Sequence, residues 1–258
     1  MQVLHLTIYI HPSCPASRNL VLYLHEKGLL NRVELVSTAR PSTSGLLREA
    51  VWSVPWLVGE GVPLATDPIE PGEAELIIRE FRTTRTSNPL DDFAEAILHS
   101  AYASAVAYLH GSLEPVLDCD FVMAATRAKL RGLDVSQVLL EAGHRAADLY
   151  ADLEDKIMRA LGISYVRELY WASGGSLSRE ELVELATPIH VGAWLIAKAS
   201  LGRSGLPSKP VPDKARLERL ASFVRRGAAG LLRRIEREYQ EVMEDENYWR
   251  ILEEHGLA

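Results

Sequence analysis

Residues 6–25 read LTIYIHPSCPASRNLVLYLH, and this stretch decides the fold. Its first five residues form an apolar, β-rich run, and an amphipathic helical pattern begins at Pro15 and ends near Gly28. The short loop between the two runs carries Cys14. We therefore expect a strand, a tight loop and a helix, with one thiol placed directly before the helix.

Cys14 at this junction is a candidate nucleophile. Unpaired N–H groups and the positive end of the helix dipole favour an anion at a helix start, and the thiolate is the reactive form of cysteine. Ser17 stands where a dithiol site would carry a second sulfur, and its hydroxyl would donate to the thiolate and lower the thiol pKa. His11 and Arg18 are close enough in sequence to add positive potential, although Arg18 could equally point to solvent. The stretch predicts a monothiol site.

Cys119 is predicted to be a structural cysteine. It lies in a helical region between Asp118 and Asp120, and two carboxylates disfavour a neighbouring thiolate. A lone cysteine is more often a small buried hydrophobic residue than a nucleophile. For Cys14, it is the strand–loop–helix context that favours a catalytic role.

The first 80 residues alternate strand and helix signals. A hairpin signal, Gly59-Glu60-Gly61, separates two short apolar runs, and Pro71 opens a helix with acidic residues near its start. The expected order is β-α-β-α-β-β-α. Its elements after the first helix are strand 32–37, helix 42–51, strands 54–58 and 62–65, and helix 70–81.

A polar segment closed by a proline, residues 83–89, has the composition of a linker, and no strand signal follows it. We expect two domains, an α/β domain over residues 1–82 and an all-α domain over residues 90–258. The segments with helical spacing of apolar residues are 91–108, 120–131, 134–161, 178–201 and 214–246. Ser178 and Glu181 form a capping-box pattern before one of them.

Composition limits the classes of function. The chain has 258 residues, 47% apolar and 24% charged, and a net charge of −7, which argues against nucleic-acid binding. No segment reaches the roughly 18 apolar residues of a membrane span, and the N-terminus lacks a signal-peptide pattern. Two distant cysteines suggest a reducing compartment, so we expect a cytoplasmic protein. The few amide residues fit either a thermophile or a GC-rich genome.

The motif Cys14-Pro15-Ala16-Ser17, placed between strand and helix, and the Val54-Pro55 strand start 40 residues later resemble the thioredoxin-like fold. With a helical second domain, the chain is similar to the glutathione transferase superfamily. It most resembles the cysteine-type members, namely the omega and lambda classes, the dehydroascorbate reductases and the chloride intracellular channel proteins. Their usual aromatic residue before the serine and the Gln after it are absent here.

The resemblance implies several site residues. Cys14 falls on the reactive thiol of the family, and Pro55 falls on its cis-proline. Val54 would pair by its backbone with the cysteinyl part of glutathione. Thr66 and Asp67 fall near the Glu-Ser pair that holds the glutamyl group, in swapped order. The implied thiol- and substrate-binding positions are Pro15, Val54, Pro55, Thr66 and Asp67, beside catalytic Cys14 and Ser17.

The resemblance implies thiol–disulfide exchange by Cys14, with glutathione or another small thiol as co-substrate and a disulfide or electrophile as second substrate. The altered residues around Ser17 and Thr66 motivate an alternative, a non-catalytic protein-interaction module of the same fold. A conjugating glutathione transferase is a weaker alternative. The histidines form no ligand-spaced cluster, so we expect no metal, and whether the chain forms a homodimer stays open.

Overall fold

The computed structural model describes residues 5–39, 51–200 and 213–257, and its packing divides the chain into two compact units. Unit 1 consists of Met1–Ser100, Leu117–His144 and Val242–Ala258, whereas unit 2 consists of Ala101–Val116 and Arg145–Glu241. The boundaries of these units differ from those of the expected domains, 1–82 and 90–258. The two expected domains therefore stay a prediction.

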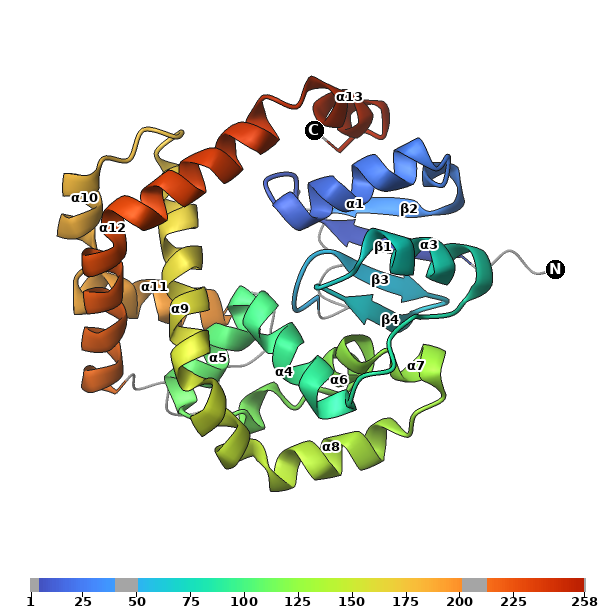
Figure 1. Cartoon of the computed structure of the whole chain (residues 1–258), viewed down its shortest axis with the longest axis horizontal. Helices are drawn as coiled ribbons and strands as arrows, with labels where there is room; N and C mark the ends of the chain where they lie inside the picture. The colour runs from blue at the N-terminus through green and yellow to red at the C-terminus, as the bar shows by residue number, and fades with distance from the viewer. Residues whose placement is uncertain (1–4, 40–50, 201–212, 258) are drawn as a thin grey trace. The chain divides into compact units, whose positions relative to one another are not determined.

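Unit 1 contains one mixed sheet, and its strands follow the expected order along the chain (Figure 1). The order across the sheet is β2-β1-β3-β4, with β1 parallel to β2 and the other neighbours antiparallel. Because β1 lies inside the sheet, its apolar residues are buried on both faces. The strands are β1 (Leu6–Ile10), β2 (Glu34–Ser37), β3 (Trp56–Gly59) and β4 (Val62–Thr66).

The predicted hairpin joins β3 to β4. Glu60 and Gly61 form its two-residue loop, with φ angles of 51° and 73°. Two positive φ angles define the tight turn whose twist matches that of the flanking strands, and glycine adopts this conformation without steric cost. The turn residues therefore set the register of this hairpin locally.

Helix α1 (Pro15–Glu26) and helix α3 (Pro71–Glu80) begin at prolines, as expected, and pack against each other. A proline is suited to the first helical turn because its missing N–H has no partner there in any case. The predicted inner face of α1 is buried, and Gly28 takes a positive φ after its end. The helix expected over residues 42–51 lies outside the described residues, apart from Val51.

Beyond β4 the described chain contains helices and no strand, in agreement with the expected helical remainder. Four of the five predicted helical segments are divided into two helices, whereas the fifth, 214–246, is one helix that ends at Met243. Short 3₁₀ turns cover Leu30–Arg32 and Glu114–Val116. The helices are α4 (Pro89–His99), α5 (Ala101–His110), α6 (Cys119–Thr126), α7 (Ala128–Arg131), α8 (Val135–His144), α9 (Ala146–Ala172), α10 (Arg179–Leu185), α11 (Pro188–Ser200), α12 (Lys214–Met243) and α13 (Glu246–Glu254).

Side-chain contacts explain two of the breaks. The hydroxyl of Ser100, between α4 and α5, donates to the carbonyl of Trp52. Arg127, between α6 and α7, takes a left-handed conformation with φ of 53°, and its guanidinium donates to the carbonyls of Ala124 and Ala125. The carbonyl of Ala124 also accepts the backbone N–H of Arg127, so the guanidinium adds a second bond there and gives the Ala125 carbonyl a partner at the end of α6. Apolar spacing alone does not encode such contacts.

The capping box predicted before α10 is confirmed, since Ser178 and Glu181 bond to each other's backbone N–H groups. In the part of the chain that the structure describes, no single helix is long and apolar enough to cross a membrane. The bent pair of α10 and α11 passes the same test of length and composition only when its two helices are counted together.

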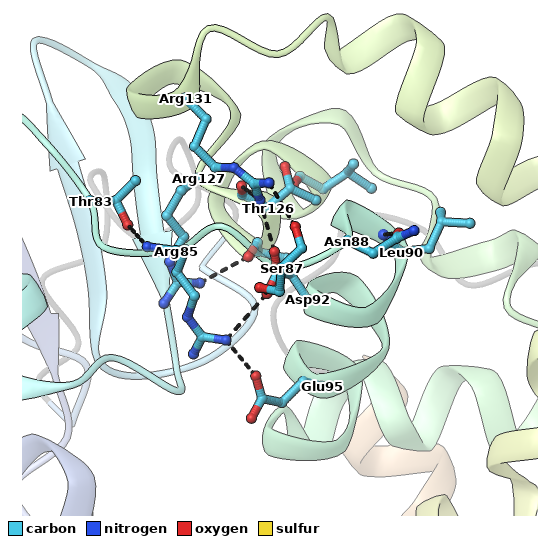
Figure 2. A network of polar contacts seen from close by, with 12 residues as sticks. Thr83, Arg85, Ser87, Asn88, Leu90, Asp92, Glu95, Thr126, Arg127 and Arg131 are labelled. Atoms are coloured by element: carbon cyan, nitrogen blue, oxygen red, sulfur yellow. Dashed lines mark hydrogen bonds and ion pairs between the residues drawn. The ribbon is translucent and has the colours of Figure 1, made fainter.

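A buried ionic network connects several elements of unit 1, and Figure 2 shows the part of it around Arg85, Asp92 and Arg131. Arg127 and Glu73 form its centre, with an Nη2–Oε2 distance of 3.2 Å and both side chains only 1% exposed. Arg85 contacts Asp92 at 3.2 Å, and Arg131 contacts the same carboxylate at 2.8 Å. The network therefore ties α3 to α4, α6 and α7.

Glu73→Gln keeps the shape of the side chain but leaves Arg127 buried without its counter-charge. Breaking one partner of a buried ion pair costs about 3–5 kcal/mol, so we expect a decrease of that size in the free energy of unfolding, measured by urea denaturation. The control is Arg82→Gln, which removes an exposed pair with Glu80 and should change stability by less than about 0.5 kcal/mol. Equal effects of the two variants would contradict a central role for the buried pair.

Candidate functional site

Cys14 is the N-cap residue of α1, with an extended backbone, and Pro15 occupies the first helical position. Its Sγ lies 3.7 Å from the carbonyl oxygen of Val54, to which the thiol donates. The Val54-Pro55 peptide bond is cis, as the resemblance implies. The structure therefore brings together four of the predicted site residues, Cys14, Pro15, Val54 and Pro55, from two distant parts of the chain.

Burial raises the pKa of the Cys14 thiol above its ordinary value. The backbone N–H of Ser17, its hydroxyl and the backbone N–H of Ala16 act in the opposite direction, and the carboxylate of Asp67 adds to the increase. Ser17 thus has the predicted effect, but loss of solvent outweighs it because the charged form is disfavoured in a low-dielectric environment. The helix start alone does not produce a thiolate at neutral pH.

The two neighbouring bases have other partners. His11 Nδ1 accepts the backbone N–H of Ser13 at 3.2 Å and lies 2.7 Å from the Ser13 hydroxyl. Arg18 forms an ion pair with Asp245, with an Nη2–Oδ2 distance of 2.5 Å. Arg18 therefore neither points to solvent nor presents an unbalanced charge to the thiol, because a carboxylate faces it.

Thr66 and Asp67 continue β4 toward the same place. The backbone N–H of Asp67 donates to the carbonyl of Pro55 at 3.1 Å, and its carboxylate lies 3.0 Å from Nδ1 of His99. The side chain of Thr66 is fully buried, and its hydroxyl has no hydrogen-bond partner among the described residues. Asp67 is the accessible member of this pair. The hydrogen bond that His99 Nδ1–H donates to the Asp67 carboxylate raises the pKa of His99 above its ordinary value.

The ionic network of Figure 2 also reaches this edge of the site. The carbonyl of Pro68 accepts Nη2 of Arg127 at 2.6 Å and Nη2 of Arg85 at 3.0 Å. Two guanidinium groups therefore fix the residue that follows Asp67. No sequence signal marked Arg85 or Arg127 for this task.

Sequence reasoning also missed the contribution of α13. The hydroxyl of Tyr248 donates to the carbonyl of Pro12 at 3.1 Å, across 236 residues. Tyr248 also interacts electrostatically with Cys14, and burial raises the pKa of its phenol. No local pattern could have identified Tyr248, Asp245 or His99, because each meets the site only through the tertiary fold.

Cys119 does not form a second site of the same kind. It is exposed at the first position of α6, and its interpretation as a structural cysteine stays a prediction. Partial loss of solvent around the sulfur, followed by the charges of Asp120 and Asp118, raises its thiol pKa. The expected effect of the flanking carboxylates on its thiolate is therefore present.

Other features of the described residues add no second candidate. They contain no group of three or more His, Cys, Asp or Glu side chains placed to hold a metal ion. A groove of about 490 Å³ lies on unit 2, between α9 and α12. Two of its arginines already have partners, since Arg219 pairs with Glu154 and Asp155 and Arg225 donates to a backbone carbonyl. The groove is lined by charges of both signs, so its electrostatics do not favour any particular class of ligand.

Comparison with known proteins finds no match for this chain among protein-family models, curated proteins or solved structures.

Because burial raises the pKa of Cys14, its alkylation rate should still increase above about pH 8.5, where an ordinary thiol is half ionised. The experiment measures the rate of iodoacetamide modification of the Cys119→Ser protein from about pH 6 to about pH 11, a range that brackets the ordinary thiol pKa. The urea-unfolded chain is the reference. Ser17→Ala should move the midpoint further up, because it removes a hydrogen bond that lowers the pKa. A native midpoint below that of the unfolded chain would contradict the dominance of burial.

The pair of His99 and Asp67 should stabilise the fold at low pH. A raised pKa means that the folded state binds the proton more tightly, so the stabilisation is present below about pH 6.5 and is lost as the pH rises through the raised value. Since His99 is 45% exposed, we expect no more than about 0.5 kcal/mol. Urea denaturation of wild type and His99→Gln below and above this pH range measures the difference in their free energies of unfolding. A difference that does not change with pH would contradict the prediction.

Proposed function

We propose that this chain is a monothiol transferase, a glutaredoxin-like reductase that uses Cys14 in thiol–disulfide exchange. The observation that carries the proposal is the position of the Cys14 sulfur, at the start of α1 and 3.7 Å from the carbonyl of Val54, next to Pro55. An extended substrate can pair with backbone groups at such a place while its disulfide meets the sulfur. Hydrogen bonds from Ser17 and Ala16 support the thiolate once it forms.

In the first step, the Cys14 thiolate attacks one sulfur of a disulfide. A new disulfide bond forms between Cys14 and that sulfur, the old bond breaks, and the other half leaves as a thiolate. A second small thiol then attacks the mixed disulfide in its deprotonated form and releases Cys14. An outside thiol is required because Ser17 offers no sulfur at the place of a resolving cysteine.

The finer assignment of the fold is part of this proposal. A mixed four-stranded sheet followed by helices is compatible with a thioredoxin-like domain over residues 1–82 and a helical domain over residues 90–258. We place the chain in the glutathione transferase superfamily, among its cysteine-type members, and in the cytoplasm. Glutathione or another low-molecular-weight thiol is the co-substrate, and the second substrate is a disulfide or an electrophile.

A non-catalytic interaction module is the second candidate, and two observations favour it. Burial raises the pKa of Cys14, and its thiol donates a hydrogen bond to Val54, so the resting sulfur is protonated. The Thr66 hydroxyl is buried rather than presented to a ligand. A conjugating glutathione transferase is a weaker candidate, because such enzymes usually stabilise a glutathione thiolate with Ser or Tyr in place of Cys14.

The decisive experiment measures reduction of a glutathione mixed disulfide by wild type and by Cys14→Ser, with several small thiols as reductant. We expect wild type to turn over and Cys14→Ser to lose the activity, because an alcohol cannot form the mixed disulfide. Cys119→Ser is the matched control and should retain the activity, since its sulfur lies outside the site. Equal inactivity of wild type and Cys14→Ser with every thiol would favour the interaction module.

A further inference from the structure

Helix α13, near the C-terminus, packs against α1 within the same compact unit (Figure 1). Its apolar face is fully buried, with Tyr248, Ile251 and Leu252 at 0% exposure. The contact reaches the loop of Cys14 itself, because the Tyr248 hydroxyl donates to the carbonyl of Pro12 at 3.1 Å. A segment from the end of the sequence therefore covers part of the thiol site.

One carboxylate serves both the folding and the docking of α13. Oδ1 of Asp245 accepts the backbone N–H of Tyr248 at 2.9 Å and so caps the helix. Oδ2 accepts both Nε and Nη2 of Arg18, at 2.8 and 2.5 Å. Arg18 lies one turn after Cys14 in α1, and its backbone N–H donates to the Cys14 carbonyl. Asp245 thus attaches the start of α13 to the helix that presents the sulfur.

We propose that α13 is a removable cover over Cys14, held closed by its buried apolar face and latched by the Arg18–Asp245 ion pair and the Tyr248–Pro12 hydrogen bond. The helix has nine residues, too few to persist alone in water, so undocking and unfolding of α13 are one step. Burial of the sulfur is also the largest influence on its pKa, so opening the cover both exposes the thiol and favours its thiolate.

The cover sets the substrate class of the site, an inference that rests on the proposed function. Cys14 as a residue remains half-buried while α13 is docked, so on this proposal only a small disulfide approaches the sulfur of the closed form. A protein disulfide needs space on both sides of its sulfur atoms and reacts only after α13 has left. The closed form therefore selects low-molecular-weight disulfides.

The test uses Asp245→Asn in the Cys119→Ser background, so that alkylation reports Cys14 alone. Asparagine caps a helix as well as aspartate does, so this change removes the ion pair and keeps the cap. We expect iodoacetamide to react about three- to tenfold faster, the range for losing one charge-assisted contact that is partly buried. Amide hydrogen exchange should accelerate in α13 and stay unchanged in β1.

Salt and two further variants sharpen the result. Raising KCl to about 1 M screens the ion pair, so it should accelerate alkylation of the parent protein but not of Asp245→Asn. Tyr248→Phe removes only the hydroxyl and should accelerate alkylation as well. Arg250→Gln, an exposed change on the same helix, is the matched control and should have no effect. Unchanged alkylation in both Asp245→Asn and Tyr248→Phe would overturn the proposal.

Failure of the cover and failure of the proposed function are distinguishable, because alkylation needs no enzymatic activity. Faster alkylation of Asp245→Asn without any disulfide exchange would keep the cover and reject the transferase. Active exchange with unchanged alkylation would reject the cover alone. As a size test, Asp245→Asn should speed reaction with native, disulfide-bonded insulin more than reaction with hydroxyethyl disulfide, and equal acceleration would contradict the selection by size.

Discussion

The ion pair between Glu73 and Arg127 is the interaction on which unit 1 depends most. Both side chains are almost fully buried, so each charge is tolerated only because the other is present. Arg127 also ends α6 by binding the carbonyls of its own helix, and it holds the carbonyl of Pro68. Through Pro68 the pair fixes the turn that carries Asp67, and Asp67 in turn acts on the candidate thiol. The Glu73–Arg127 ion pair thus contributes both to the packing of the helices and to the position of Asp67 in the candidate site.

The chemistry of Cys14 is a balance between solvent loss and hydrogen bonding. Three donors at the start of α1 favour the thiolate, but burial and the charge of Asp67 favour the thiol. Because burial is the largest influence, any movement that exposes the sulfur changes its ionisation and its accessibility together. The proposed opening of α13 would therefore reconcile a protonated resting cysteine with the proposed exchange chemistry.

Much of the fold followed from local patterns. The four strands, the hairpin at Glu60-Gly61 and the inner face of α1 were predictable, because side-chain periodicity and turn residues act within a few positions of the chain. The division of the helical segments was not predictable. The breaks at Ser100 and Arg127 arise where side chains bond to backbone carbonyls, in one case across 48 residues, and apolar spacing contains no record of such bonds.

The sequence by itself determined that one cysteine stands at a strand–helix junction, with Ser17 beside it and a Val-Pro pair 40 residues later. Those features are local, and the structure keeps Cys14, Val54 and Pro55 together. Only the tertiary structure decided the burial of Cys14, its partner across the site and the packing of α13 against α1. The physical reason is that solvent loss depends on which distant groups pack nearby. From the far end of the chain, Asp245 pairs with Arg18, and Tyr248 bonds to Pro12 and interacts electrostatically with Cys14.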